Sequence, residues 1–151
     1  MTQSSDETAI GALLRAHAQA IHDKDADATL APYAADLVRY DLAPPLATKG
    51  AQALDRGNLQ GWFDTWRGPI RYALADFAIT ANGDIGFAHG FVKIGGTKHE
   101  GYTGNLWARQ TVCLRKQGGT WMIVHEHTST PFYMDGSVRA AVDLAPPGAA
   151  R

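Results

Sequence analysis

Four long segments rich in strand-forming residues follow Gly68-Pro69, and they constrain the fold more than any other feature of the sequence. The first two flank Asn82-Gly83, a dipeptide typical of tight β-hairpins, and the last two are joined by QGG. Antiparallel strands can be joined by such short turns, whereas parallel strands need long crossovers. The segments are IRYALADFAIT, IGFAHGFVKI, LWARQTVCLRK and WMIVHEHTST. We therefore expect a four-stranded antiparallel meander, with the glycine-rich residues 95–105 as a long hairpin loop.

Two helices are predicted at the start of the chain. Ser4 and Glu7 have the spacing of a capping box, and the apolar residues after them repeat with a helical period. Asp25 can cap a short second helix that ends at Pro32. The stripe of the first helix is formed by Ile10, Leu13, Leu14, His17 and Ile21. His17 is therefore expected on the core side.

A strand over residues 37–42 and a third helix over residues 51–67 complete the first half of the chain. APPL ends the strand, and Gly68-Pro69 ends the helix. Helices followed by hairpin-linked strands are typical of an α+β fold with helices on one face of an antiparallel sheet. Because the strands are long, we expect a strongly curved sheet around three N-terminal helices, forming a cone with a pocket inside.

Length and charge narrow the classes of function. The 151 residues predict one domain, 1–151, with a frayed tail at 141–151. Lys and Arg number 14 and Asp and Glu 15, so the net charge of −1 gives no electrostatic case for nucleic acid. No apolar run reaches membrane-spanning length, and the polar start lacks a signal peptide, so we expect no membrane partner and a cytoplasmic location. Cys113 is the single cysteine, which excludes an internal disulfide.

The order of these elements resembles the NTF2-like fold, and within it the SnoaL-like and ketosteroid-isomerase-like families. Two segments carry the resemblance, DKDADATLAPYAADLVRYDLAPPLATKG and LRKQGGTWMIVHEHTSTPF. The resemblance implies a pocket for a small apolar ligand, no cofactor, and a homodimer through the outer face of the sheet. It does not name a reaction, because this fold hosts isomerases, cyclases, dehydratases, binding modules and association domains.

The family's catalytic residues can be carried over one at a time. Asp41 lies eight residues after the aromatic Tyr33, at the place of the general base of the ketosteroid isomerases. The helix position that carries an oxyanion donor in those enzymes is occupied by His17. Their second donor would fall near Val112, which cannot donate a hydrogen bond. The resemblance thus implies a base and one substitute donor, with the third group missing.

WMIVHEHTST places His125 and His127 on one strand face and Glu126 on the other. The resemblance directs the two histidines into the pocket and Glu126 toward solvent or a dimer partner. Three interpretations stay open: histidines that tie strands together, histidines in acid/base or ligand contact, and a His-x-His metal site. A metal site would need a third ligand, for which Asp41, His17 and His89 are candidates.

Several other residues have alternative roles. The apolar surroundings of Asp41 are expected to raise its pKa toward that of a general base, although it can instead cap the turn before Pro44. His17 can be a core histidine, and Arg109 is either an ion-pair strut or an anchor for a carboxylate. The predicted ligand-binding residues are Tyr33, Trp62, Trp66, His89, Arg109, Ser129 and Phe132.

We therefore expect a cofactor-independent acid/base enzyme of the isomerase, cyclase or dehydratase type, acting on a small apolar carbonyl compound. Asp41 would take a proton next to the carbonyl group, and His17, His125 or His127 would stabilise the enolate oxygen. The alternatives are a non-catalytic ligand-binding or dimeric association module, and a metal-binding protein built on His125 and His127.

Overall fold

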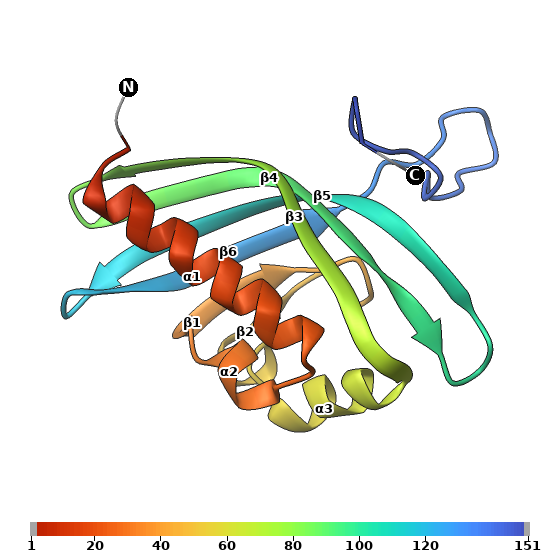
Figure 1. The fold of residues 1–151 in the computed structure, drawn as a ribbon, viewed down its shortest axis with the longest axis horizontal. Helices are drawn as coiled ribbons and strands as arrows, with labels where there is room; N and C mark the ends of the chain where they lie inside the picture. The colour runs from red at the N-terminus through yellow and green to blue at the C-terminus, as the bar shows by residue number, and fades with distance from the viewer. Residues whose placement is uncertain (1–2, 150–151) are drawn as a thin grey trace.

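The computed structural model describes residues 3–149 and shows an α+β fold in which helices cover one face of a curved sheet (Figure 1). The sheet has six strands in the order β2-β1-β6-β5-β4-β3. The helical elements are α1 (Ser5–His22), α2 (Ala26–Leu30), the short 3-10 helix η1 (Gly50–Gln52) and α3 (Arg56–Asp64). The strands are β1 (Tyr33–Tyr40), β2 (Thr48–Lys49), β3 (Trp66–Asn82), β4 (Ile85–Lys98), β5 (Thr103–Gln117) and β6 (Thr120–Ser129).

Both predicted N-terminal caps are confirmed. The Glu7 amide donates to Ser4 Oγ at 3.1 Å, and the Ser4 amide donates to Glu7 Oε2 at 3.1 Å, which completes the capping box of α1. Asp25 caps α2 by accepting a hydrogen bond from the Ala28 amide at 3.0 Å. Local sequence signals therefore fix where these two helices begin.

The third helix is shorter than the predicted 51–67, and it comes after β1 and β2 in the chain. α3 begins only after Asp55, whose side chain accepts from the Asn58 amide, and it ends at Asp64. Trp66 matched the helical apolar stripe, but it is the buried first residue of β3. An apolar residue at the right spacing does not distinguish the end of a helix from the start of a buried strand.

The sheet is mixed rather than wholly antiparallel. β3, β4, β5 and β6 form the predicted meander, but β1 pairs with β6 in parallel. This pairing sets Arg39 beside Glu126 and Tyr40 beside His127. A strand from the first half of the chain thereby lies next to the last strand, which brings together the polar residues of both.

Irregularities in β3 account for the curvature. The pairing of β3 with β4 shifts between Arg67 and Arg71 and again between Ala75 and Ala78. Gly68 and Asp76 lie at these shifts with φ of 74° and 54°. Bulges of this kind bend a strand and increase its twist, so the sheet curls around the helices.

Residues 95–105 do not form the predicted long loop. β4 continues to Lys98 and β5 begins at Thr103, with Gly95 paired to Asn105 and Gly96 to Gly104. A Cβ atom on Gly95 would meet the Gly104 carbonyl oxygen at 2.5 Å. The glycine therefore marks a close approach of backbones inside a hairpin rather than a loop.

Two apolar clusters hold the helices on the sheet. The larger joins α1 to the centre of the sheet, and its fully buried members are Ile10, Leu37, Ala88, Val112 and Ile123. The smaller lies at the other end and contains Ile21, Ala26, Phe63, Trp66 and Ile70. The space between the two clusters is where the pocket described below opens.

Residues 130–149 follow β6 and lie beyond the end of the sheet (Figure 1). Phe132 bridges to Ala140, and the Tyr133 hydroxyl donates to Asp143 Oδ2 at 2.6 Å. In the segment predicted to fray, Ala141 and Pro146 are buried, while residues 150 and 151 lie outside the described residues. None of the helices between residues 3 and 149 has the length and apolar character needed to cross a membrane.

Candidate functional site

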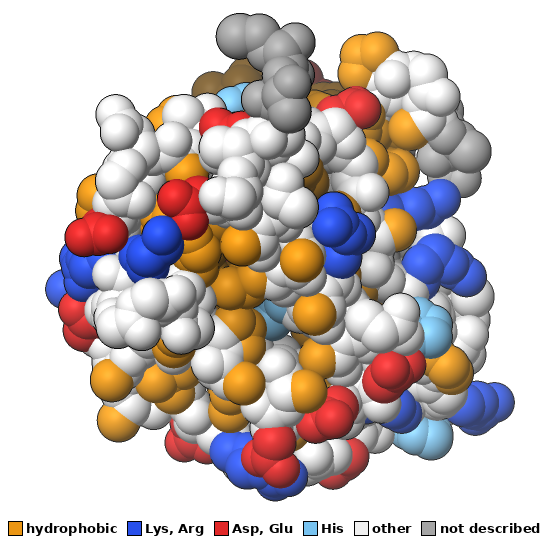
Figure 2. Space-filling model, turned by 60° about the vertical axis from the view of Figure 1, so that its left-hand side comes forward, with side chains coloured by type: hydrophobic (Ala, Val, Ile, Leu, Met, Phe, Trp, Pro, Cys, Tyr) orange, Lys and Arg blue, Asp and Glu red, His pale blue; other side chains and the backbone are white. Residues whose placement is uncertain are grey.

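A pocket of about 620 Å³ opens between the sheet and the helices. This volume is within the range of small-molecule sites. Helix residues such as Leu30, Leu59 and Trp62 form one wall, and Ile94 and Leu106 from the sheet form the facing wall. The pocket is therefore apolar over much of its lining. Figure 2 shows one face of the molecule, where hydrophobic side chains gather centrally and charged side chains lie around them.

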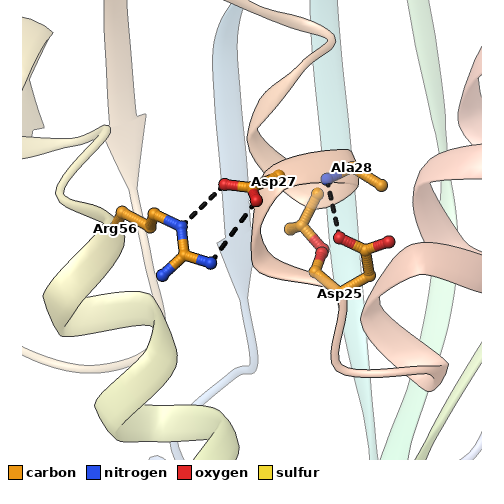
Figure 3. A network of polar contacts seen from close by, with 5 residues as sticks. Asp25, Asp27, Ala28 and Arg56 are labelled. Carbon is orange, nitrogen blue, oxygen red and sulfur yellow. Dashed lines mark hydrogen bonds and ion pairs between the residues drawn. The ribbon is translucent and has the colours of Figure 1, made fainter.

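An exposed ion pair links the two short helices beside the pocket (Figure 3). Arg56 donates from Nε to Asp27 Oδ1 at 2.6 Å and from Nη2 to Asp27 Oδ2 at 3.4 Å, which joins α3 to α2. The same picture shows Asp25 capping α2 at Ala28. An exposed pair of this kind contributes little to stability.

Glu126 lies inside the pocket and is 7% exposed. Its Oε2 atom accepts a hydrogen bond from the Tyr33 hydroxyl at 2.8 Å. Burial raises the pKa of this carboxyl group, and it outweighs the opposing effects of Arg39 and of the Tyr33 hydrogen bond. A carboxyl group with a raised pKa keeps its proton to a higher pH than an exposed glutamate does.

A second polar group surrounds Tyr72. Gln110 Nε2 donates to the Tyr72 hydroxyl oxygen at 3.0 Å and to Thr128 Oγ1 at 3.1 Å. Burial, and then the nearby Glu126 charge, raise the pKa of Tyr72, so its hydroxyl keeps its proton. Because the oxygen already accepts from Gln110, the hydroxyl hydrogen is left to donate toward a ligand in the pocket.

Arg39 brings a positive charge into the same pocket. Its guanidinium carbon lies 5.0 Å from the centre of the Tyr33 ring, a cation–π arrangement. Its Nε atom is buried and has no hydrogen-bond partner among the described residues. Burial alone would lower the pKa of Arg39, but the nearby Tyr33, Glu126 and Asp41 outweigh it and raise the pKa, so the side chain stays charged.

Asp41 lies one residue beyond β1 and lines the exposed mouth of the pocket. Its Oδ1 atom accepts a hydrogen bond from the Leu42 amide at 2.7 Å. The position near the pocket and the local turn contact that the sequence left as alternatives are therefore both present. The apolar burial expected for Asp41 is found instead at Glu126.

The predicted orientation of His125 and His127 is wrong. Leu114 pairs with Ile123 and Cys113 pairs with His125, so Val124 is an extra residue in β6. A bulge of one residue moves every later side chain to the other face. Glu126 and Thr128 therefore point into the pocket, and the two histidines lie on the outer face.

The two histidines contact neighbouring groups on that outer face. His125 Nδ1 lies 2.7 Å from the Val38 carbonyl oxygen, so this histidine ties β6 to β1. The ring of Tyr40 lies edge-on to both histidines, with centroid distances of 4.8 Å to His125 and 5.5 Å to His127. No group of three His, Cys, Asp or Glu side chains able to hold a metal occurs among residues 3–149.

Of the remaining predicted site residues, some line the pocket and others lie outside it. Tyr33, Trp62 and Trp66 line the pocket. His17 is buried beside the Tyr33 ring at 5.1 Å and is not part of the lining. Four predicted ligand-binding residues do not line the pocket. His89, Arg109 and Ser129 lie on the outer face of the sheet, and Phe132 lies beyond the end of β6.

The sequence interpretation missed Glu126 and Arg39 as pocket residues. A signal for Arg39 was present, because Leu37, Arg39 and Asp41 alternate along β1 and must share a face. The position of Glu126 had no comparable local signal, because it depends on the bulge at Val124. Val112, where the sequence lacks the family's second donor, pairs with Glu126 on β6.

The fold and pocket define an NTF2-like protein, and the comparisons agree. Residues 10–133 match the SnoaL-like domain, and the chain belongs to that family. No curated protein matches it. An NTF2-like protein of unknown function from Pseudomonas putida KT2440 is 32% identical, with a TM-score of 0.84, and the match covers 97% of this chain and 100% of that one.

Two further solved structures share the fold. A ketosteroid isomerase-like protein from Erwinia carotovora atroseptica SCRI1043 is 22% identical with a TM-score of 0.70, and the match covers 84% of this chain and 97% of that one. The association domain of C. elegans CaMKII is 16% identical with a TM-score of 0.64, covering 84% and 100%. Proteins of this fold thus include isomerase-like and association domains, and the fold alone does not choose between them.

Proposed function

We propose that this protein is a cofactor-independent acid/base enzyme that acts on a small, largely apolar carbonyl compound. The observation that carries the proposal is a pair of carboxyl groups in unlike surroundings within one apolar pocket, Glu126 buried and Asp41 at the mouth. Burial raises the pKa of Glu126, and a carboxyl group with a raised pKa suits the role of proton donor.

In this proposal Asp41 takes the proton next to the carbonyl group. Glu126, hydrogen-bonded to Tyr33, and the free hydroxyl hydrogen of Tyr72 donate toward the oxygen that becomes an enolate. The reaction then moves a proton without a change of oxidation state, as an isomerase, cyclase or dehydratase step requires. The histidines of β6 have no part in it, because they lie on the outer face.

Replacing Asp41 by asparagine is expected to slow proton abstraction about 100-fold, the lower end of what a general base contributes. The free energy of unfolding should not change, because the amide oxygen can still accept from Leu42. The measurement is loss of the α-proton signal from a panel of enolisable ketones and aldehydes in D₂O, followed by ¹H NMR.

The matched control is Asp36→Asn, which makes the same change at an exposed carboxyl group that lies on β1 and does not line the pocket. This variant should exchange protons at the wild-type rate. Equal rates for wild type and Asp41→Asn, or no exchange above the uncatalysed rate with any compound of the panel, would count against the proposed function.

We also infer that two copies associate through the outer face of the sheet. Ile85 and Phe87 on β4 support this, because they are 59% and 45% exposed on the face away from the helices. Large apolar side chains gathered on a sheet face commonly mark an interface. Such an association is compatible with an enzyme and with an association module.

The wild-type chain is expected to sediment at twice its mass of 16.2 kDa, and Phe87→Lys at the monomer mass. A lysine there would place an unpaired charge inside the interface. Sedimentation equilibrium measures both, with Phe132→Lys as the control, since Phe132 is exposed beyond the sheet. A wild-type monomer would exclude this association.

A further inference from the structure

We propose that Arg39 binds a carboxylate group of the ligand, so that the pocket takes a small organic monoanion with an apolar body. The starting point is a guanidinium group inside the pocket that lies near the carboxyl groups of Glu126 and Asp41 but forms an ion pair with neither. No described carboxylate forms an ion pair with Arg39, and no described acceptor bonds to its buried Nε atom. An enclosed cation without a hydrogen-bonded partner is costly, which favours an anion from outside the chain.

The neighbouring acids are already engaged. Glu126 is next to Arg39 in the pairing of β1 with β6, but its Oε2 accepts from the Tyr33 hydroxyl. Asp41 shares the inward face of β1, but its Oδ1 accepts from the Leu42 amide at the mouth. The Arg39 guanidinium carbon lies over the Tyr33 ring, and this contact does not use the N–H groups of the guanidinium. The N–H donors of Arg39 therefore remain for a ligand.

The charges around the pocket select a monoanion over a phosphate. The lining contains the cations Arg39 and Lys98 and the acids Asp41, Asp55 and Glu126. Lys98 is engaged at the rim, where its Nζ donates to Thr65 Oγ1 at 2.6 Å. One free guanidinium group among several carboxyl groups suits a ligand with a single negative charge. Two parallel N–H groups of the planar guanidinium can donate to the two oxygens of a carboxylate.

The rest of the ligand is defined by the apolar walls. Leu30, Leu59, Trp62, Ile94 and Leu106 face the same space of about 620 Å³, which fits an aromatic or branched aliphatic body. Taken with the proposed function, on which this last step rests, the substrate is a carboxylic acid that also carries an enolisable carbonyl group. The carboxylate would lie at Arg39, and the carbonyl oxygen would face Tyr72 and Glu126.

The test compares matched acids and amides by isothermal titration calorimetry with the full chain. Phenylacetate and 4-methylpentanoate are paired with phenylacetamide and 4-methylpentanamide, which have similar shapes and no charge. The acids are expected to bind at least about tenfold more tightly than the amides, as a charge-assisted hydrogen-bonded pair provides. Inorganic phosphate is expected to bind more weakly than either acid.

Arg39→Met should remove the preference for the acid and leave the affinity for the amide unchanged. Arg109→Met is the matched control, because Arg109 is exposed on the outer face and should not affect either ligand. If Arg39→Met does not fold, the wild-type comparison of acid with amide still decides the question. Equal affinity for acid and amide, no binding of either acid, tighter binding of phosphate, or a preference that survives Arg39→Met overturns the proposal.

The binding test and the exchange test fail independently. Acids that bind through Arg39 while no carbonyl compound exchanges its α-proton would support the carboxylate site and count against the enzyme. Neutral ketones that exchange, together with equal binding of acids and amides, would support the enzyme and overturn the carboxylate site.

Discussion

Replacing Phe63 by alanine is expected to lower the free energy of unfolding by about 3–5 kcal/mol, the usual cost of truncating a buried aromatic side chain. Phe63 is 0% exposed and is the buried residue that α3 contributes to the smaller apolar cluster. The cluster joins α3 to Ile21 and Ala26 on the first two helices and to Ile70 on β3. An alanine would leave a cavity at this junction, because the three other elements that meet there cannot all move in to fill it.

Urea denaturation followed by circular dichroism measures this loss. Phe132→Ala is the matched control, because it makes the same chemical change at an exposed position beyond the sheet, where the cost should stay within about 0.5 kcal/mol. Because Leu59 and Trp62 on α3 line the pocket, Phe63→Ala should also weaken ligand binding. Equal losses for the two variants would show that the smaller cluster does not hold α3.

The caps and the hairpin turn were predictable because their causes are local. The capping box that begins α1 involves only Ser4 and Glu7, which are three residues apart. The hairpin turn likewise needs only a local backbone preference: β3 ends at Asn82, β4 begins at Ile85, and Gly83 between them has φ of 59°. Such features lie within one turn of chain, so the sequence contains all the information that they require.

The face that β6 presents to the pocket could not be predicted in the same way. Counting alternate residues from Trp121 gives His125 and His127 the inward positions, and this count is correct only as far as Ile123. Val124 is a good strand former, and nothing in its local sequence marks it as a bulge. The bulge shows only in the pairing with the neighbouring strand, where Leu114 pairs with Ile123 and Val112 pairs with Glu126.

The polar pocket residues show the limit of a hydrophobic pattern. A rule that places apolar residues inside expects Arg39 and Glu126 in water, yet both point inward from paired positions on β1 and β6. The cost of burying them is met in part by contacts that are distant in the sequence, such as Tyr33 with Glu126. Departures of this kind from a local rule are most common at functional sites.

Lowering the pH from 7 to 4 is expected to remove about 3 kcal/mol of folding stability through His17 alone. In the folded chain, burial and then the positive charge of Arg39 lower the pKa of His17 to about 4, while its bond to the Thr29 backbone opposes them. In the unfolded chain the pKa returns to the model-peptide value of about 6.5. Between these two values the unfolded state binds the additional proton, so stability is complete above pH 6.5 and falls as the pH drops toward 4.

The measurement is urea denaturation of wild type and His17→Phe at several pH values, because the variant keeps a ring beside Tyr33 but cannot bind the proton. The raised pKa of Glu126 acts in the opposite direction, since its folded form takes up a proton first as the pH falls, and the comparison cancels this contribution. Relative to wild type, His17→Phe should gain about 3 kcal/mol between pH 7 and 4. His99→Phe, at an exposed turn, should show no such gain. Parallel curves for wild type and His17→Phe would mean that His17 is protonated without unfolding, and that water reaches its buried ring.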